Sequence, residues 1–291
     1  NGKSTVTTLA GQMATLAEKN GGRPAFVGGN LGDALCLAVG TDAASERGIV
    51  VAELSSFQLE DAGDLRCHVA ACLNVTDDHL DRHGTFARYA AAKGRIFRMQ
   101  RKGDHAVVPA GDALCLSLAQ AGPGTIHPFG AGGEVAVVDG TIRDRESGLS
   151  FPVSRLRIQG LHNQANACAA ALCARRAGLP RSAIEEVLAT FAGLPHRMVP
   201  VREVDGVVYY DDSKATNVGA AVAALDGLSD LRGKVVLVAG GVDKGGSYAP
   251  LRERLERLGR AVVLLGQAAP LIRTAMAGSP IELRDVASMD E

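Results

Sequence analysis

The chain has 291 residues, of which 46% are hydrophobic, and this is enough apolar material for two domains with separate cores. Its formal net charge is −1 and no long run of one sign occurs, which argues against a nucleic-acid or membrane-surface partner. No apolar stretch approaches the roughly 20 residues that a membrane span requires.

The chain opens on half of a phosphate-binding loop. Asn1-Gly2-Lys3-Ser4-Thr5 leads into an expected helix, as in the second half of a Walker A loop. In such loops backbone N–H groups hold phosphates, the lysine reaches the β- and γ-phosphates, and the serine hydroxyl ligates Mg²⁺. We therefore expect ATP or GTP binding. Because the loop's first glycine and an initiator methionine are missing, we interpret the chain as part of a longer protein. A chance Gly-Lys-Ser at a helix start is the alternative.

Strand-like apolar runs then alternate with helical patterns. The expected strands cover residues 48–54, 68–75, 106–108, 234–239 and 261–265. The expected helices cover residues 4–18, 85–100, 163–177, 182–192, 218–228 and 249–258. This alternation predicts an α/β protein with mostly parallel sheets flanked by helices. Two Asp-Gly turns, Asp139-Gly140 and Asp205-Gly206, each join two apolar runs and predict local hairpins.

A domain boundary is expected near Leu194-Pro195, where a helical pattern gives way to a hairpin and a new alternation. Residues 1–195 would form a central ATP-binding domain, and residues 196–291 an incomplete Rossmann-like domain. The six cysteines show no C-x-x-C spacing and several lie in apolar stretches, which indicates buried free thiols in a reducing cytoplasm.

Polar side chains follow two of the expected strands. Glu53 ends the first, where α/β nucleotide enzymes hold Mg²⁺ beside a phosphate loop, although a surface glutamate at a strand end fits equally well. His79 lies in the polar stretch 74–82 after the second strand. It could bind a metal, hydrogen-bond a substrate or cap a loop, and its acidic neighbours could simply cap the next helix.

Further candidates lie on a helix and near the domain boundary. Lys93 follows three alanines in an expected helix, and on sequence chemistry alone it is a solvated helix lysine. Arg197 could clamp a phosphate or form an interdomain salt bridge. Residues 211–217 gather acids, hydroxyls, a lysine and an amide at one strand-to-helix turn, which favours a ligand site. The glycine-rich turn 239–246 could bring Lys244 to an anionic substrate.

Taken together, five stretches of the chain resemble the Mur ligases. They are residues 1–5, 53–60, 74–82, 194–197 and 212–217, and they occur in the order seen in that family. Leu54-Ser55-Ser56-Phe57-Gln58-Leu59 and Asp212-Ser213-Lys214-Ala215-Thr216-Asn217 are similar to the members that add D-glutamate. The resemblance implies an N-terminal UDP-binding domain, absent here, a central ATPase domain and a Rossmann-like C-terminal domain. Asp211 departs mildly from the pattern, which more often has Asn there.

The resemblance also implies a reaction: ATP-dependent amide formation in peptidoglycan synthesis through an acyl phosphate. The implied cofactors are ATP and Mg²⁺, and the implied catalytic residues are Lys3, Glu53, His79 and Lys93. One Mg²⁺ would be held by Ser4 and Glu53, and a second by His79 and a carbamylated Lys93. The implied ATP contacts are Asn1, Gly2, Lys3, Ser4, Thr5, Asn163, Asn166, Arg197 and Asp212. The implied substrate contacts are Asn30, Ser55, His79, Lys214, Thr216 and Lys244.

The implied partners are small molecules, UDP-N-acetylmuramoyl-L-alanine and D-glutamate. We expect no nucleic acid, no membrane span, a cytoplasmic monomer, and no ligase activity from the chain alone. Two alternatives stay open: another Mur-type or folylpolyglutamate-type amide ligase, or a non-catalytic nucleotide-binding module. Phe57-Gln58 and residues 212–217 argue against the first alternative. The cluster of charged candidates argues against the second, because a nucleotide switch needs fewer.

Overall fold

A computed structural model describes residues 1–229 and 233–291 and divides them into two compact units. The first unit comprises Asn1–Val75 and Ala87–Gly193, and the second comprises Thr76–Phe86 and Leu194–Glu291. No helix among the described residues has both the length and the apolar composition to cross a bilayer.

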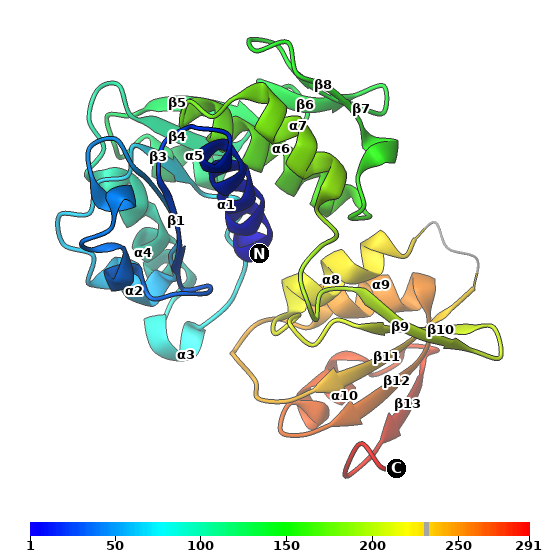
Figure 1. The fold of residues 1–291 in the computed structure, drawn as a ribbon. Coiled ribbons are helices and arrows are strands. Elements are labelled where there is room, and N and C mark those ends of the chain that lie inside the picture. Colours follow the sequence, from blue (N-terminus) through cyan, green and yellow to red (C-terminus); the bar gives the residue numbers. More distant parts are fainter. Residues whose placement is uncertain (230–232) are drawn as a thin grey trace. The chain divides into compact units, whose positions relative to one another are not determined.

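The first unit contains two sheets (Figure 1). Strands β1 (Ala25–Gly29) and β2 (Ile49–Glu53) form a parallel pair. A six-stranded sheet runs in the order β3-β4-β5-β6-β7-β8. It is parallel from β3 to β6 and antiparallel thereafter. Its strands are β3 (Val69–Ala71), β4 (His105–Pro109), β5 (Thr125–Phe129), β6 (Val135–Val138), β7 (Thr141–Asp144) and β8 (Ser150–Pro152).

Helices cover both faces of the larger sheet. Ala106 and Val108 of β4 pack into one cluster with Phe97 of α4 and Cys115 of α5. Val107 points to the opposite face, where α6 contacts the sheet and also packs against α1 (Figure 1). The helices are α1 (Lys3–Lys19), α2 (Ser56–Glu60), α4 (Phe86–Arg98), α5 (Ala113–Ala119), α6 (Leu161–Arg176) and α7 (Arg181–Thr190), with 3₁₀ turns at Leu35–Ala38, Asp42–Ala44 and Val153–Arg155.

The second unit is built on a parallel sheet of order β11-β12-β13 with a small apolar core. Buried leucines of α8, α9 and β12, among them Leu225, Leu255 and Leu264, form that core. An antiparallel hairpin of β9 and β10 makes a separate two-stranded sheet. The elements are α3 (Leu80–His83), β9 (Val199–Val204), β10 (Val207–Asp211), α8 (Val218–Gly227), β11 (Val235–Gly240), α9 (Ala249–Leu258), β12 (Gly259–Leu265), α10 (Ala269–Ala275) and β13 (Glu282–Asp285).

The α/β prediction is confirmed, and so are both hairpins. Asp139 and Gly140 have φ of 49° and 67°, and Asp205 and Gly206 have φ of 51° and 76°, the left-handed backbone that tight hairpin turns require. Sequence periodicity missed several elements. Strand β1 contains two glycines and β5 contains a proline, so both look weak as strands.

Candidate functional site

The phosphate-loop residues lie at the N-terminus of α1. Gly2 precedes the helix with φ of 82°, a left-handed conformation that favours glycine. A Cβ on Gly2 would lie 2.4 Å from Oδ1 of Asn166, so the Asn166 side chain on α6 lies close against the loop backbone and would have to move to admit a side chain there. The first turn of α1 carries no acidic residue to offset the positive end of the helix. The local geometry is therefore that of an anion-binding loop.

Glu53 is the one predicted site carboxylate that the first unit buries. Its side chain ends β2, is only 4% exposed, and accepts a hydrogen bond at Oε1 from Nδ2 of Asn30 over 2.7 Å. Its Oε2 is buried without a hydrogen-bond partner. The backbone N–H of Asn30 also donates to the Glu53 carbonyl over 2.8 Å, so the parallel pairing of β1 and β2 fixes both residues. A buried carboxylate oxygen without a partner is costly unless a cation satisfies it.

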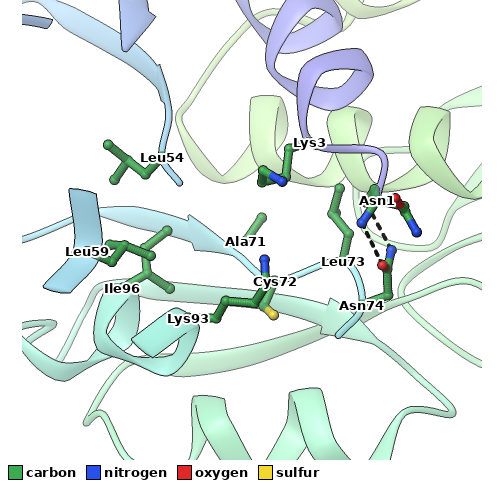
Figure 2. A pocket seen from close by; sticks show the side chains of 10 residues that line it. All are labelled: Asn1, Lys3, Leu54, Leu59, Ala71, Cys72, Leu73, Asn74, Lys93 and Ile96. Carbon is green, nitrogen blue, oxygen red and sulfur yellow. Dashed lines mark hydrogen bonds between the residues drawn. The ribbon is translucent and has the colours of Figure 1, made fainter. Parts of the chain in front are cut away.

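A small cavity of about 40 Å³ lies between the phosphate loop and α4. Its lining includes Asn1, Lys3 and Lys93, together with Cys72 and Asn74 from the segment after β3 (Figure 2). The volume holds about three waters or similarly small groups. Two lysines therefore line one cavity, which gives it a positive character suited to phosphate oxygens.

Lys93 packs within its own helix. Its Nζ lies 4.8 Å from the centre of the Tyr89 ring, one turn earlier on α4. Tyr89 itself is buried, so the stem of Lys93 does not lie on an open helix face. Lys93 itself is half-buried, and its role stays a prediction.

Asn74 connects the segment after β3 to the phosphate loop. Its Nδ2 donates to the Asn1 carbonyl over 3.0 Å, and its Oδ1 accepts from the Asn1 amino group over 2.7 Å (Figure 2). Asn163 and Asn166 lie in the first two turns of α6, and Nδ2 of Asn166 donates a hydrogen bond to Oδ1 of Asn163 over 3.3 Å. Both of these predicted ATP contacts therefore lie on the helix that approaches Gly2.

Ser55 forms a helix cap. Its Oγ accepts a hydrogen bond from the Gln58 N–H over 3.2 Å, while Oε1 of Gln58 accepts from the Ser55 N–H over 2.8 Å. This reciprocal capping box starts α2 directly after Glu53. A substrate role for Ser55 stays a prediction.

In the second unit the polar candidates gather around Asp78, which sequence reasoning did not single out. Oδ2 of Asp78 accepts from Nδ2 of Asn217 over 2.8 Å, and Oδ1 lies 3.5 Å from Nζ of Lys244. The same carboxylate accepts the N–H of His79, whose φ of 53° is left-handed. Partial burial lowers the pKa of His79, against the opposing effect of Asp78, and Lys244 adds to the lowering. One carboxylate thus organises two predicted site residues, His79 and Lys244.

The turn after β10 is also organised by carboxylates. Oδ1 of Asp212 accepts the Met198 N–H over 3.1 Å, and burial raises the pKa of Asp212. Asp211 binds the Ser213 N–H and Nδ1 of His196, which together lower its pKa to about 2. The Lys214 N–H donates to the His196 carbonyl, so this turn and residues 196–198 hold each other. His196 and Met198 have φ of 62° and 49°, a costly backbone in which these hydrogen bonds hold them.

The predicted metal residues are divided between the units. Ser4, Glu53 and Lys93 belong to the first unit and His79 to the second. Within residues 1–229 and 233–291, no three His, Cys, Asp or Glu side chains gather as a metal-binding group. The Glu53 carboxylate nevertheless fits Mg²⁺, which is usually held by one or two carboxylates plus phosphate oxygens and waters.

The sequence of the chain matches two known protein-family profiles. The profile of the Mur ligase middle domain matches residues 1–174, and that of the Mur ligase glutamate ligase domain matches residues 196–291. UDP-N-acetylmuramoylalanine--D-glutamate ligase of Pseudomonas aeruginosa is 46% identical over 300 residues, and that of Solibacter usitatus is 40% identical over 293. Each alignment covers 100% of this chain and 64% of the relative, so the chain spans less than two thirds of these relatives' length.

Solved structures share the fold at lower identity. MurF of Acinetobacter baumannii matches with a TM-score of 0.75 and 22% identity, over 99% of this chain and 66% of that one. Thermotoga maritima MurF in complex with ADP matches with a TM-score of 0.66 and 19% identity, over 98% of this chain and 74% of that one. With the middle-domain profile covering more than half of its residues, the chain belongs to the Mur ligase family.

Proposed function

We propose that the first unit binds Mg²⁺·ATP. The observation that carries the proposal is the buried, unpartnered Oε2 of Glu53 in the unit that also holds the phosphate loop. Ser4 and Glu53 would hold Mg²⁺, which supplies a positive charge that offsets the charge on the β- and γ-phosphates. Asn30 orients the Glu53 carboxylate through its other oxygen. Lys3 and the N-terminus of α1 would bind the phosphates themselves.

In the intact protein we propose that this site serves D-glutamate ligation. The L-alanine carboxylate of UDP-N-acetylmuramoyl-L-alanine would attack the γ-phosphate and displace ADP, and the D-glutamate amine would then attack the resulting acyl phosphate and displace phosphate. Lys3 would offset the repulsion between carboxylate and ATP. The identities of 46% and 40% to two D-glutamate ligases support this substrate choice. The cytoplasmic location and monomeric state expected from the sequence stay predictions.

His79, Lys214, Thr216 and Lys244 would bind substrate, and Arg197 and Asp212 would bind ATP. The hydrogen bonds and the ion pair that fix residues of the second unit support this assignment. Asp78 fixes His79 and Lys244, and Asp212 fixes the backbone next to Arg197. A preorganised constellation of this kind is typical of binding sites rather than of ordinary turns.

We further propose that Lys93 is carbamylated by CO₂. A lysine ammonium would repel Mg²⁺, whereas a carbamate provides oxygen ligands. Lys93→Ala should therefore cut the turnover of the intact protein strongly, and acetate should partly restore it by supplying oxygens. Near-normal turnover of Lys93→Ala without acetate would show that the residue is an ordinary helix lysine. Lys102→Ala, an exposed lysine beyond α4, is the matched control.

The substrate assignment is tested by phosphate release. The intact protein is supplied with ATP, UDP-N-acetylmuramoyl-L-alanine and D-glutamate, L-glutamate, meso-diaminopimelate or L-lysine in separate reactions. Release should depend on D-glutamate. Comparable release with meso-diaminopimelate would contradict the assignment, and release without any amino acid would favour a nucleotide-binding module.

A further inference from the structure

Two cysteines from distant parts of the sequence meet beneath the cavity of the first unit. The Sγ atoms of Cys72 and Cys115 lie 3.7 Å apart, and both side chains are buried. Cys72 follows β3 and lines the cavity that also contacts Lys3 and Lys93 (Figure 2). Cys115 lies in the first turn of α5, where its N–H donates to Oδ1 of Asp112 over 2.9 Å. No other cysteine pair among the described residues has a comparable sulfur contact in the structure.

We propose that Cys72 and Cys115 form a reversible disulfide when a hydroperoxide reaches the cavity. Cys72 is the thiol that reacts first with the hydroperoxide, because it lines the cavity whereas Cys115 is 0% exposed. A disulfide requires the sulfurs to approach to about 2.05 Å, which is a small movement from the observed contact.

The chemical environment of Cys72 differs from that of three other buried or half-buried thiols. Burial raises the pKa of Cys67 to about 11 and those of Cys168 and Cys173 to about 12, which keeps them protonated and unreactive. The pKa of Cys72 is lowered, because Cys115 hydrogen-bonds to its sulfur. The pKa of Cys115 is raised by the same contact. Cys72 is thus the more acidic thiol of the pair, and it is also the one that lines the cavity.

The reaction proceeds in two balanced steps. With hydrogen peroxide as the hydroperoxide, the Cys72 thiolate attacks one peroxide oxygen, an S–O bond forms and the O–O bond breaks, giving a sulfenic acid and a hydroxide that is protonated to water. Cys115 then attacks the Cys72 sulfur, the S–S bond forms, the S–O bond breaks, and the thiol proton leaves with the hydroxyl as a second water. Two thiols are oxidised and one hydroperoxide is reduced; a thiol reductant reverses the change.

The disulfide would disturb the phosphate loop, an effect that rests on the proposed ATP site. Cys72 is joined through Leu73 to Asn74, and Nδ2 of Asn74 donates to the Asn1 carbonyl over 3.0 Å. Leu73 also lies against Gly2, since a Cβ there would be 3.3 Å from Cδ1 of Leu73. Movement of the Cys72 sulfur toward α5 therefore pulls on the segment that supports the loop.

The disulfide is tested by treating the reduced chain with hydrogen peroxide, alkylating the remaining thiols under denaturing conditions, and mapping peptides by mass spectrometry. We expect a peptide joining Cys72 to Cys115, removed by dithiothreitol. Cys115→Ala should abolish it and leave Cys72 as a trappable sulfenic acid, whereas Cys168→Ala, a matched buried thiol on α6, should leave it intact. Oxidation of the exposed Cys36 without any Cys72–Cys115 peptide in the wild-type chain would overturn the proposal.

The coupling is tested by ATP titration of the reduced and the oxidised chain. We expect oxidation to weaken ATP binding at least about fivefold and dithiothreitol to restore it. Unchanged affinity in fully cross-linked chain would overturn the coupling. A reduced chain that binds no Mg²⁺·ATP would instead contradict the proposed function and leave the disulfide assignment standing.

Discussion

The two units position their polar candidates in different ways. In the first unit Glu53 is fixed at the end of a paired strand, and Gly2 is fixed by close approach of α6. In the second unit Asp78 and Asp212 fix loops through hydrogen bonds, and β9 is exposed along its whole length. Packing therefore determines the first constellation, whereas a few polar contacts determine the second.

Four ion-paired carboxylates show the same contrast. The carboxylates of Asp104 and Asp144 in the first unit have side-chain exposures of 0% and 2%, whereas those of Asp226 and Asp285 in the second have 43% and 61%. Removing one partner of a buried ion pair costs much more folding stability than removing one partner of an exposed pair. Equivalent substitutions in the two units should therefore have unequal effects.

Lys3→Ala should have the largest effect on activity. Lys3 lines the cavity at the start of α1 and would track charge on the transferred phosphoryl group. We expect turnover of the intact protein to fall by about a thousandfold while the melting temperature stays unchanged. The measurement is phosphate release under saturating substrates, with Lys19→Ala at the other end of α1 as control. Activity within about tenfold of the wild type would show that Lys3 does not act at the phosphates.

Gly2→Ala should weaken ATP binding by about tenfold or more, because a Cβ would lie 2.4 Å from Oδ1 of Asn166 and force the loop to move. Gly140→Ala is the matched control. It imposes a similar left-handed strain, with φ of 67°, but its Cβ would meet nothing within 4 Å. Both variants should lose about 1 kcal/mol of stability. Equal ATP affinity in the two variants would show that the close approach does not shape the loop.

Asp104→Asn should lower the melting temperature of the first unit by roughly 5 °C, while Asp226→Asn should leave that of the second nearly unchanged. Arg66 donates to both Asp104 oxygens, over 2.8 and 2.7 Å, and holds the pKa of that carboxyl well below its ordinary 3.8. Because the pKa of Asp104 is lower in the folded chain, its ionised carboxylate contributes its full stabilisation at pH values above the ordinary carboxyl pKa. That stabilisation is lost progressively as the pH falls below the ordinary value toward the folded-state pKa. Calorimetry should show the Asp104→Asn deficit in full at pH 7 and a smaller deficit below about pH 4. A deficit independent of pH would contradict this origin.

Asp78→Asn should have a modest effect on stability, about 1 kcal/mol, because Asn217 and Lys244 remain partly solvated. The loss should be local. Hydrogen exchange should quicken in Thr76–Phe86, the segment that Asp78 joins to the rest of the second unit. Asp77→Asn, at an exposed neighbouring acid, is the control. Unchanged exchange in the Asp78→Asn segment would show that the carboxylate does not organise this site.

The sequence predicted a residue's place correctly where a local pattern, such as the end of an apolar run, marks the end of a strand. Glu53 ends an apolar run, so its place at a strand end was readable, although its burial and its unpartnered oxygen were not. The Ser55-to-Gln58 spacing is a capping-box signal and could have revealed the role of Ser55 as a helix cap. Short strands with glycine or proline, such as β1 and β5, carry little periodicity and were missed.

Sequence reasoning failed where folding chooses among equivalent side chains. Several acidic residues follow β3, and Asp78 is the one whose carboxylate accepts from Asn217 and lies beside Lys244. The Cys72–Cys115 contact spans 43 residues and depends on how α5 packs on the sheet. Neither arrangement leaves a local pattern that spacing or composition could reveal.

Glu53→Gln gives the most direct test of the central claim, that packing holds a Mg²⁺·ATP site in the first unit. The amide keeps the Asn30 hydrogen bond and removes a buried charge whose Oε2 has no hydrogen-bond partner. Melting temperatures are compared without ligand, with ATP alone and with Mg²⁺·ATP, in wild type and in the control Glu185→Gln on α7. We predict that Glu53→Gln melts at or above the wild-type temperature without ligand and loses the additional stabilisation that Mg²⁺ gives to ATP. A Mg²⁺-dependent shift equal to that of the wild type would contradict the account.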